Sequence, residues 1–242
     1  MMRSFSYLFI SRMRFLPLLV FGTMLLTGCN PVDKDETVPP AQQNRNFQSE
    51  MDKKHGQLWT ADERQRANTG ATVSYLSQVE KEVFYYINLL RINPARFASS
   101  YAKDYTGVVG WTNGYGFDER KASLIQELTA LPPLPILKPN ETLFGSADCF
   151  ATSGGQMGLT GHDRTGTGCE ANAGLAECTS CGGYVTGLSV VMDFLIDAGE
   201  SNSGLGHRRI LLSSDYEWMG VAIRKHKNYD QMVVLNLDSR NL

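Results

Sequence analysis

Large apolar residues are spread unevenly along the chain of 242 residues, and this unevenness limits which part of it can fold. An apolar run at residues 15–26 is followed, up to about residue 72, by a polar stretch with few large apolar side chains. Such a stretch buries too little surface to offset the entropy of ordering. We therefore expect a flexible polar stalk at residues 29–72 and one globular domain at residues 73–242, whose length of about 170 residues is that of an ordinary domain.

The N-terminal segment, residues 1–28, has the layout of a secretory signal. Three arginines without any acidic residue precede an apolar run that is too short to span a bilayer. The segment leads into Leu26-Thr27-Gly28-Cys29, which resembles the lipobox of bacterial lipoproteins. This resemblance implies cleavage before Cys29, lipidation of Cys29 and a membrane anchor in a bacterial cell envelope, at the outer membrane on its periplasmic or its cell-surface face. An ordinary cleaved signal or an uncleaved anchor is the alternative.

Composition bears on the partners of the domain. Apolar residues make up 42% of the chain, as in ordinary globular proteins. The net charge of −2 gives no electrostatic reason to expect nucleic acid as a partner. The sequence also has no glycine-rich phosphate-binding loop of the Walker or Rossmann type.

Four cysteines remain once Cys29 is set aside: Cys149, Cys169, Cys178 and Cys181. An even number of cysteines in an oxidising compartment favours disulfides, so we expect two of them. The sequence leaves all three pairings open. A four-cysteine zinc site is the competing interpretation, because Cys178-x-x-Cys181 has the spacing of zinc ligands.

Cap residues and apolar periodicity predict the helices of the domain. Ser77 and Glu80 form a capping box ahead of a helix that ends near Ile92. Asn93-Pro94 begins a second, short helix that runs to about Tyr101. Further helical segments are expected at 124–128, from 139 to 154–155 or slightly beyond, and from 184 to a C-cap at 199.

Two β-like runs, Glu217–Arg224 and Gln231–Leu237, flank a polar turn and are expected to pair as an antiparallel hairpin. The stretch at residues 158–183 consists mostly of glycine, cysteine and polar residues, so we expect a long loop there, and such loops are usually functional. Helices combined with a small terminal sheet predict an α+β fold in which helices pack on the sheet as a sandwich.

Histidines give the main indication of a functional site. His162 and His207 each follow a glycine and precede a charged residue, whereas His55 falls in the expected stalk and His226 in the hairpin turn. Imidazole is the commonest metal ligand and titrates near neutral pH, so a histidine–carboxylate cluster suits Zn²⁺ binding or acid–base chemistry. The acidic candidates near His162 and His207 are Asp163, Glu170, Glu177, Asp193 and Asp197.

Several short motifs follow one another along the domain: Phe84–Pro94, Leu134–Asn140, Gly161–Asp163, Ala176–Cys178, Val185–Asp197, Gly206–Leu212 and Trp218–Ile223. Their order resembles that of the CAP superfamily, also called the SCP domain. This superfamily contains cysteine-rich secretory proteins, venom antigens, plant pathogenesis-related proteins and many bacterial relatives. Each motif is weak alone, but together they cover about residues 77–240, which is essentially the whole domain.

The resemblance implies an α-β-α sandwich with a small antiparallel sheet and a cleft lined by two histidines and two acids, which bind zinc in some members. By position, His162 and His207 match the two histidines. Glu177 matches the glutamate of the family's Gly-Glu-Asn motif, although the tripeptide here reads Ala-Glu-Cys, and Glu170 is an alternative first acid. Asp197 stands at the position of the second acid, where animal members have a glutamate, whose side chain is one methylene longer.

Three functions are compatible with the sequence, and it leaves open whether the chain is an enzyme. The first is a lipid-anchored binding module, whose cleft of His162, Glu177, Asp197 and His207 takes a divalent metal, Zn²⁺ above all, and recognises an extracellular lipid, glycan or protein. The second is a hydrolase that uses His162, Glu177 and His207, with His162 or Glu177 as general base. Ser201 and Ser203 lie near His207 in sequence but look like ordinary loop serines. The third is a structural envelope protein with a vestigial cleft.

Overall fold

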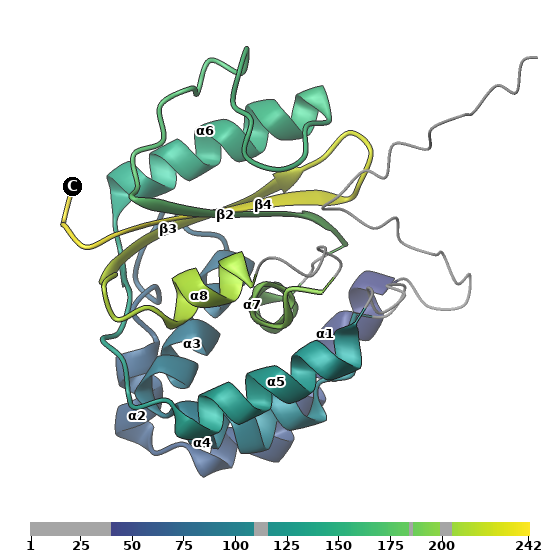
Figure 1. Cartoon of the computed structure of the whole chain (residues 1–242), viewed down its shortest axis with the longest axis vertical. Coiled ribbons are helices and arrows are strands. Elements are labelled where there is room, and N and C mark those ends of the chain that lie inside the picture. Colours follow the sequence, from purple (N-terminus) through teal and green to yellow (C-terminus); the bar gives the residue numbers. More distant parts are fainter. Residues whose placement is uncertain (1–39, 109–115, 184–185, 199–204) are drawn as a thin grey trace, which may run out of the picture.

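The structure is a computed structural model that describes residues 40–108, 116–183, 186–198 and 205–242 (Figure 1). These residues form a mixed α/β domain, in which helices pack on both faces of a small sheet, in agreement with the predicted α+β class. The helices are α1 (Pro40–His55), α2 (Ala61–Ala67), α3 (Gln78–Ile92), α4 (Pro94–Phe97), α5 (Phe117–Ala130), α6 (Glu141–Met157), α7 (Gly187–Ile196) and α8 (Gly206–Leu212), with a 3₁₀ turn at Gly56–Leu58 and a π-helical turn at Ala98–Ala102.

Within the described residues the sheet has four strands in the order β1-β3-β4-β2, where β1 is Lys138–Pro139, β2 is Ala176–Gly182, β3 is Trp218–Lys225 and β4 is Gln231–Asp238. Strands β3 and β4 form the predicted antiparallel hairpin. Strand β2 pairs with the free edge of β4, also antiparallel, and the short β1 runs parallel to β3. The sequence analysis placed β2 inside a long loop, and this was wrong from Ala176 onward, because the strand is stabilised by pairing with β4 and not by its own Gly-, Ser- and Cys-containing sequence.

Strands β2, β3 and β4 place their side chains alternately in two apolar clusters, one on each face of the sheet. On β4, Met232 and Val234 pack with α6, whereas Val233 and Leu235 pack with the cluster on the opposite face. Figure 1 shows α6 above the sheet and α7, α8 and α3 below it, with α1, α2, α4 and α5 farther from the sheet. The sheet therefore stands between two groups of helices, and its lower face belongs to the larger core.

Three predicted helix starts, those of α3, α4 and α6, are confirmed by their caps. The side chain of Ser77 accepts a hydrogen bond from Glu80 N–H and completes the capping box of α3. The amide oxygens of Asn93 and Asn140 cap α4 and α6 in the same way. Helix α5 is longer than the predicted 124–128. The C-cap of α7 is Asp197, which takes up the left-handed conformation (φ 56°), so the predicted C-cap at residue 199 was wrong.

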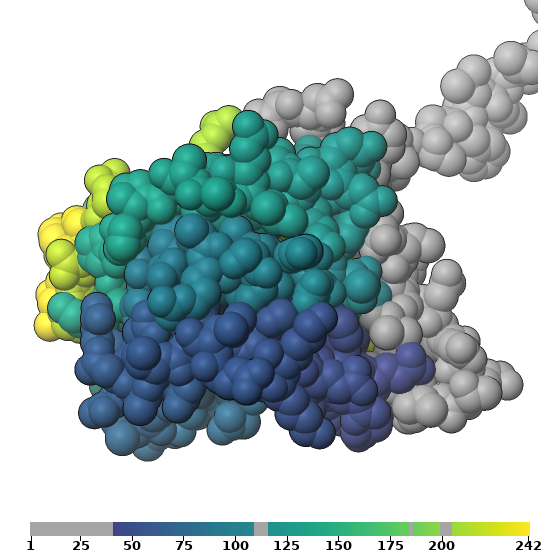
Figure 2. Space-filling model, turned by 90° about the horizontal axis from the view of Figure 1, so that it is seen from below, coloured from purple at the N-terminus to yellow at the C-terminus, as the bar shows by residue number. Residues whose placement is uncertain are grey.

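The prediction of a flexible stalk up to residue 72 was wrong from residue 40 onward, because α1 and α2 pack on the domain. The segment has few apolar residues, yet Met51 and Trp59 are buried. Polar contacts add to this packing: the hydroxyl groups of Tyr86 and Tyr101 donate to Asp52 at 2.7 and 3.0 Å. Figure 2 shows the purple and blue atoms of this segment continuous with the rest of the surface. Residues 1–39, including Cys29, lie outside the described residues.

Cys149 and Cys169 form a disulfide, whereas Cys178 and Cys181 are free thiols, so the expectation of two disulfides was wrong. The two free cysteines lie on β2 three residues apart, and side chains at that spacing point to opposite faces of a sheet. Cys178 is buried in the large core cluster and Cys181 in the cluster beneath α6. The same geometry rules out the four-cysteine zinc site.

Candidate functional site

The structure brings together the four residues that the resemblance singled out, as two histidine–acid pairs. His162 and Glu177 form the first pair, and His207 and Asp197 form the second. The two imidazole rings face each other with their centroids 6.4 Å apart, at a mutual tilt of 48°. Each pair comes from a different part of the chain, so the fold alone accounts for their meeting.

The first pair joins the loop after α6 to strand β2. The Nδ1 atom of His162 lies 2.9 Å from Oε1 of Glu177, and because an ionised carboxylate only accepts, Nδ1 is the donor. The His162 side chain is 57% exposed, whereas that of Glu177 is 8% exposed. A buried carboxylate therefore orients an imidazole that reaches into solvent.

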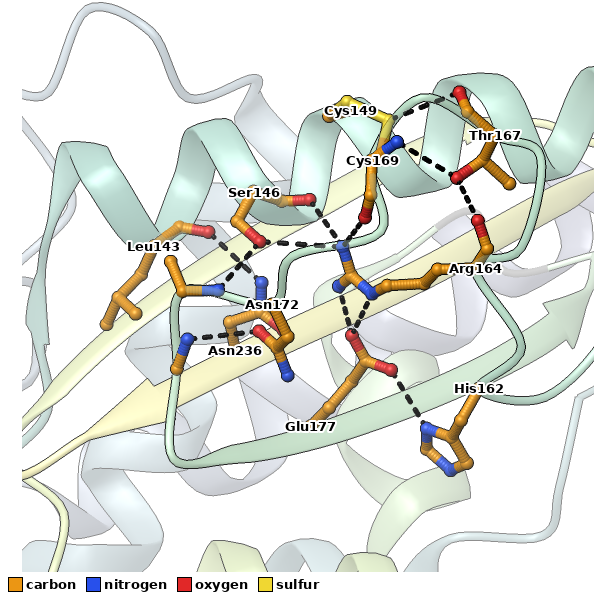
Figure 3. A network of polar contacts seen from close by, with 12 residues as sticks. Leu143, Ser146, Cys149, His162, Arg164, Thr167, Cys169, Asn172, Glu177 and Asn236 are labelled. Atoms are coloured by element: carbon orange, nitrogen blue, oxygen red, sulfur yellow. Dashed lines mark hydrogen bonds and ion pairs between the residues drawn. A yellow bond between two sulfur atoms is a disulfide. The ribbon is translucent and has the colours of Figure 1, made fainter.

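Figure 3 shows how Glu177 is held in turn. The guanidinium group of Arg164 is buried and donates to Oε2 of Glu177 from Nε at 3.1 Å and also from Nη2. One carboxylate oxygen of Glu177 thus accepts hydrogen bonds from Arg164, and the other accepts a hydrogen bond from His162. The loop that carries His162 and Arg164 is joined to α6 by the Cys149–Cys169 disulfide.

The second pair lies where α7 ends and α8 begins. Oδ1 of Asp197 lies 2.9 Å from Nδ1 of His207, while Oδ2 accepts the His207 backbone N–H at 3.2 Å. The left-handed conformation of Asp197 turns the chain at this point, and it is a conformation that Asp and Asn tolerate better than most residues. The side chains of His207 and Asp197 are 15% and 3% exposed, so this pair is much more buried than the first.

Buried neighbours fix the second pair. The ring of Phe194 on α7 packs edge-on against His207, with centroids 5.1 Å apart. The guanidinium group of Arg208 is buried and donates to the carbonyl oxygens of Leu195 and Ile196, directly before Asp197. The backbone on both sides of the pair is therefore anchored in the core.

A cavity of about 470 Å³ opens beside the first pair and is lined by His162, Asp163, Arg164, Thr165, Glu170, Asn172 and Glu177. Glu170, the alternative first acid, accepts a hydrogen bond from Gly168 N–H, and Glu177 is the acid that contacts His162. The Thr165 backbone N–H donates to Asp163 and lowers the pKa of this exposed carboxyl group. The cavity is thus polar and rich in carboxylates.

The thiol of Cys178 is buried in the core, within electrostatic range of both acids of the site. Burial raises the pKa of Cys178 well above its usual value, and the negative charges of Asp197 and Glu177 raise it further. The thiol therefore stays protonated at neutral pH, which argues against a role as nucleophile.

The remaining candidates lie elsewhere or outside the described residues. His55 contacts Asp104 at 2.8 Å, and His226 contacts the carbonyl oxygen of Leu159 at 2.8 Å, so both have structural partners away from the two pairs. Asp193 accepts a hydrogen bond from the Ser180 hydroxyl. Ser201 and Ser203 lie outside the described residues. The family resemblance had placed Phe194 at the position of a tryptophan three residues before the second acid, and the structure puts its ring against His207. The sequence analysis did not single out Arg164, because its importance lies in contacts with residues distant in the chain.

The spacing of the two histidines bears on whether one metal ion can bind between them. Within the described ranges, no three His, Cys, Asp or Glu side chains are positioned to hold one ion. Zinc–nitrogen bonds are about 2.0–2.1 Å long, so rings 6.4 Å apart are near the upper limit for sharing an ion. Because Nδ1 of each ring faces a carboxylate, Nε2 is the nitrogen that fits a metal, and a carboxylate on the opposite ring nitrogen is the usual second partner of such histidines.

No protein-family model matches this chain, and no curated protein matches it. Among the described residues, no helix has the length and apolar character needed to cross a bilayer. The geometry of the two histidine–acid pairs therefore carries the functional argument.

Proposed function

We propose that this chain is a lipid-anchored, extracytoplasmic protein with a CAP-type domain, whose two histidine–acid pairs bind a divalent metal, Zn²⁺ above all, and recognise an extracellular lipid, glycan or protein. One observation carries the proposal: two imidazoles from separate parts of the chain face each other, and each has a carboxylate on its Nδ1 atom. Orienting two histidines in this way is typical of metal sites.

The arrangement of helices around the sheet supports the CAP-type sandwich. Helix α6 covers one face, and α3, α7 and α8 cover the other. The site residues come from the loop after α6, from β2 and from the α7–α8 turn, where the family resemblance implies the cleft.

In the proposed site, His162 and His207 hold the metal through Nε2, while Glu177 and Asp197 orient the rings and offset the added positive charge. When bound, the metal supplies Lewis acidity to a ligand oxygen. Two protein ligands alone leave positions for water or ligand oxygens, and the carboxylates that line the adjacent cavity are suited to hydrogen bonding with hydroxyl or amine groups of that ligand.

The proposed lipid anchor at Cys29 places this site close to a membrane of the cell envelope. Residues 30–39 separate Cys29 from the start of α1. A fully extended chain gains at most about 3.3–3.6 Å per residue, so the domain would start within about 40 Å of the lipid. Mass measurement of Cys29-containing peptides tests this part, since lipidation adds acyl chains that an unmodified cysteine lacks.

Zinc titration tests the metal site. We expect the full chain, purified in mild detergent and stripped of metal, to bind one Zn²⁺ ion in isothermal titration, and the His162→Asn/His207→Asn variant to lose this binding. The His226→Asn variant is the matched control, because it removes a histidine outside the two pairs and should bind as the wild type does. Absence of zinc binding in the wild-type chain would refute the metal site.

A hydrolase is the second candidate, and the same pairs favour it. An exposed imidazole whose Nδ1 is held by a buried carboxylate has the arrangement of a general base that takes a proton from water through Nε2. Glu177 is less suited to this role, because Arg164 already binds one of its oxygens. His162→Asn should then abolish hydrolysis of an ester or peptide panel without lowering the melting temperature. If both His→Asn variants lower stability but change neither zinc binding nor hydrolysis, the pairs are structural.

A further inference from the structure

We propose that Arg164 is a positioning residue for the site, and that together with the Cys149–Cys169 disulfide it holds His162 opposite His207, so that the metal site is complete only while this disulfide is formed. The inference rests on the proposed function, in which His162 is a metal ligand. It adds a redox dependence to that function and assigns a role to a residue that does not itself ligate the metal.

The contacts of Arg164 connect three parts of the fold (Figure 3). Its Nε and Nη2 donate to Glu177 on β2. Its Nη1 donates to the carbonyl oxygen of Ser146 on α6 at 3.3 Å and to that of Cys169 in the loop at 3.1 Å. The guanidinium carbon also lies 4.4 Å from the ring centroid of Phe150. A single buried side chain therefore fixes β2, α6 and the disulfide-bearing loop relative to one another.

The orientation of His162 depends on this arrangement. Its ring is mostly exposed, and the contacts that the structure gives it are the hydrogen bond to Glu177 and the approach to His207. Glu177 presents Oε1 to His162 because Arg164 binds Oε2. Loss of Arg164 removes its two donors to Oε2 of Glu177 and leaves the Asn236 amide as the remaining donor to that oxygen, so the carboxylate and the exposed imidazole are held less firmly.

The disulfide holds in place the Cys169 carbonyl oxygen, which accepts a hydrogen bond from Arg164. Residues 158–175 contain no helix or strand, and the disulfide through Cys169 is the covalent cross-link that ties this loop back to α6 beyond the backbone connection at Met157–Gly158. Without the link, the Cys169 carbonyl oxygen is held near Arg164 by weaker contacts alone, and the loop gains conformational freedom. Because His162 lies on the same loop, its position relative to His207 then becomes less well defined.

This disulfide is also open to reduction. Cys149 lies on the exposed face of α6, whereas the free thiols of Cys178 and Cys181 are buried. A thiolate of an external dithiol can attack the sulfur of the exposed residue Cys149 and form a mixed disulfide, which releases the Cys169 thiolate. The second thiol of the dithiol then displaces Cys149 and forms a disulfide within the reagent. Two electrons and two protons pass to Cys149 and Cys169, which become thiols, and the dithiol becomes a disulfide. In an oxidising compartment the site is thus assembled, and a reducing agent disassembles it.

The test compares zinc affinity and ring contact in the full chain. Four variants are needed: Arg164→Ala, Arg164→Lys, Cys149→Ser/Cys169→Ser and the control Arg96→Ala, which removes an arginine that pairs with Glu63 among the outer helices. Zinc affinity is measured by isothermal titration, and the ring contact by the nuclear Overhauser effect between His162 and His207 ring protons. Circular dichroism at the same temperature establishes that each variant is folded.

We expect Arg164→Ala and the double cysteine variant to lower zinc affinity at least tenfold and to lose the Overhauser contact, while Arg96→Ala keeps both. Arg164→Lys should restore part of the affinity, because lysine retains the charge but lacks the planar fork. Reduction with dithiothreitol, which is removed before the titration because dithiols themselves bind Zn²⁺, should reproduce the loss in the wild-type chain, reversibly on reoxidation, and have no effect on the double cysteine variant.

Two results separate failure of this inference from failure of the proposed function. If Zn²⁺ binds the wild-type chain and neither reduction nor Arg164→Ala changes affinity or ring contact, the positioning role is overturned and the metal site stands. If the wild-type chain binds no zinc, the metal site falls, and loss of the ring contact on reduction still decides whether Arg164 and the disulfide position His162.

Discussion

The two histidine–acid pairs perform the same local task, orienting an imidazole through Nδ1, but the fold supports them in opposite ways. The pair at His207 is formed by two helix ends within the core and is almost fully buried. In the pair at His162, Glu177 lies on β2 but the histidine lies on a loop without helix or strand, and its exposed ring is held indirectly by Arg164 and a disulfide. One half of the site is therefore fixed by the core of the domain, while the other depends on a small number of removable contacts.

This contrast predicts that Arg208, beside the second pair, contributes more to the free energy of unfolding than Arg164, beside the first. Arg208→Ala leaves several buried carbonyl oxygens without a donor, among them those of Leu195 and Ile196, so we expect a loss of about 4 kcal/mol in the free energy of unfolding. Urea unfolding measures it. Arg164→Ala should cost less, about 2 kcal/mol, because part of its surroundings is the loop. A larger loss for Arg164→Ala than for Arg208→Ala would reverse the comparison.

Removing the disulfide should destabilise the domain by about 3 kcal/mol, since it closes a loop with a sequence separation of 20 residues. Chemical denaturation of Cys149→Ser/Cys169→Ser measures this loss. Hydrogen exchange should show increased opening in residues 158–175, and unchanged protection in α7 and α8. Equal loss of protection around His207 would show that the two halves of the site are not independently supported.

The backbone at Asp197 distinguishes the second pair from the first. Asp197→Ala places an ordinary side chain in a left-handed conformation and also removes the carboxylate, so we expect it to cost about 1.5 kcal/mol more than Asp197→Asn, because Asn tolerates this conformation. Thermal or urea unfolding of the two variants gives the difference. At Glu177, which lies in an ordinary strand, the Ala and Gln variants should differ less. Identical stabilities of Asp197→Ala and Asp197→Asn would show that the left-handed backbone at this position does not contribute to the difference between the pairs.

The histidines themselves should give the smallest effects. His207→Asn removes a mostly buried ring that packs on Phe194 and should lower the free energy of unfolding by about 1.5 kcal/mol. His162→Asn removes an exposed ring and should change it by less than about 0.5 kcal/mol. A stability loss at His162 as large as that at His207 would mean that the first pair is a structural element.

Local signals in the sequence account for the features that were predicted correctly. The caps at Ser77, Asn93 and Asn140 act within a few residues, and the β3–β4 hairpin is formed by neighbouring segments. Strand β2 was missed because its pairing partners on β4 lie 49 to 61 residues further along the chain. The packing of α1 and α2 was missed because it depends on contacts with α3 and on single buried side chains.

The site shows the same division between local and distant information. His162 and His207 could be recognised from their glycine-flanked positions, and Glu177 and Asp197 from the order of motifs, and the structure brings all four together. Arg164 could not be recognised, because it becomes important only when α6, β2 and the loop are assembled around it. The spacing of Cys178 and Cys181 was misleading, since the same spacing on a strand sends the two thiols to opposite faces.

A double-mutant cycle of zinc binding tests most directly whether the two pairs form one site. It requires the wild-type chain, His162→Asn, His207→Asn and the double variant, all titrated with Zn²⁺ under oxidising conditions. One shared ion predicts that each single variant loses nearly as much affinity as the double variant, with one ion bound per wild-type chain. Additive losses, or a single variant that keeps wild-type affinity, would contradict the shared site.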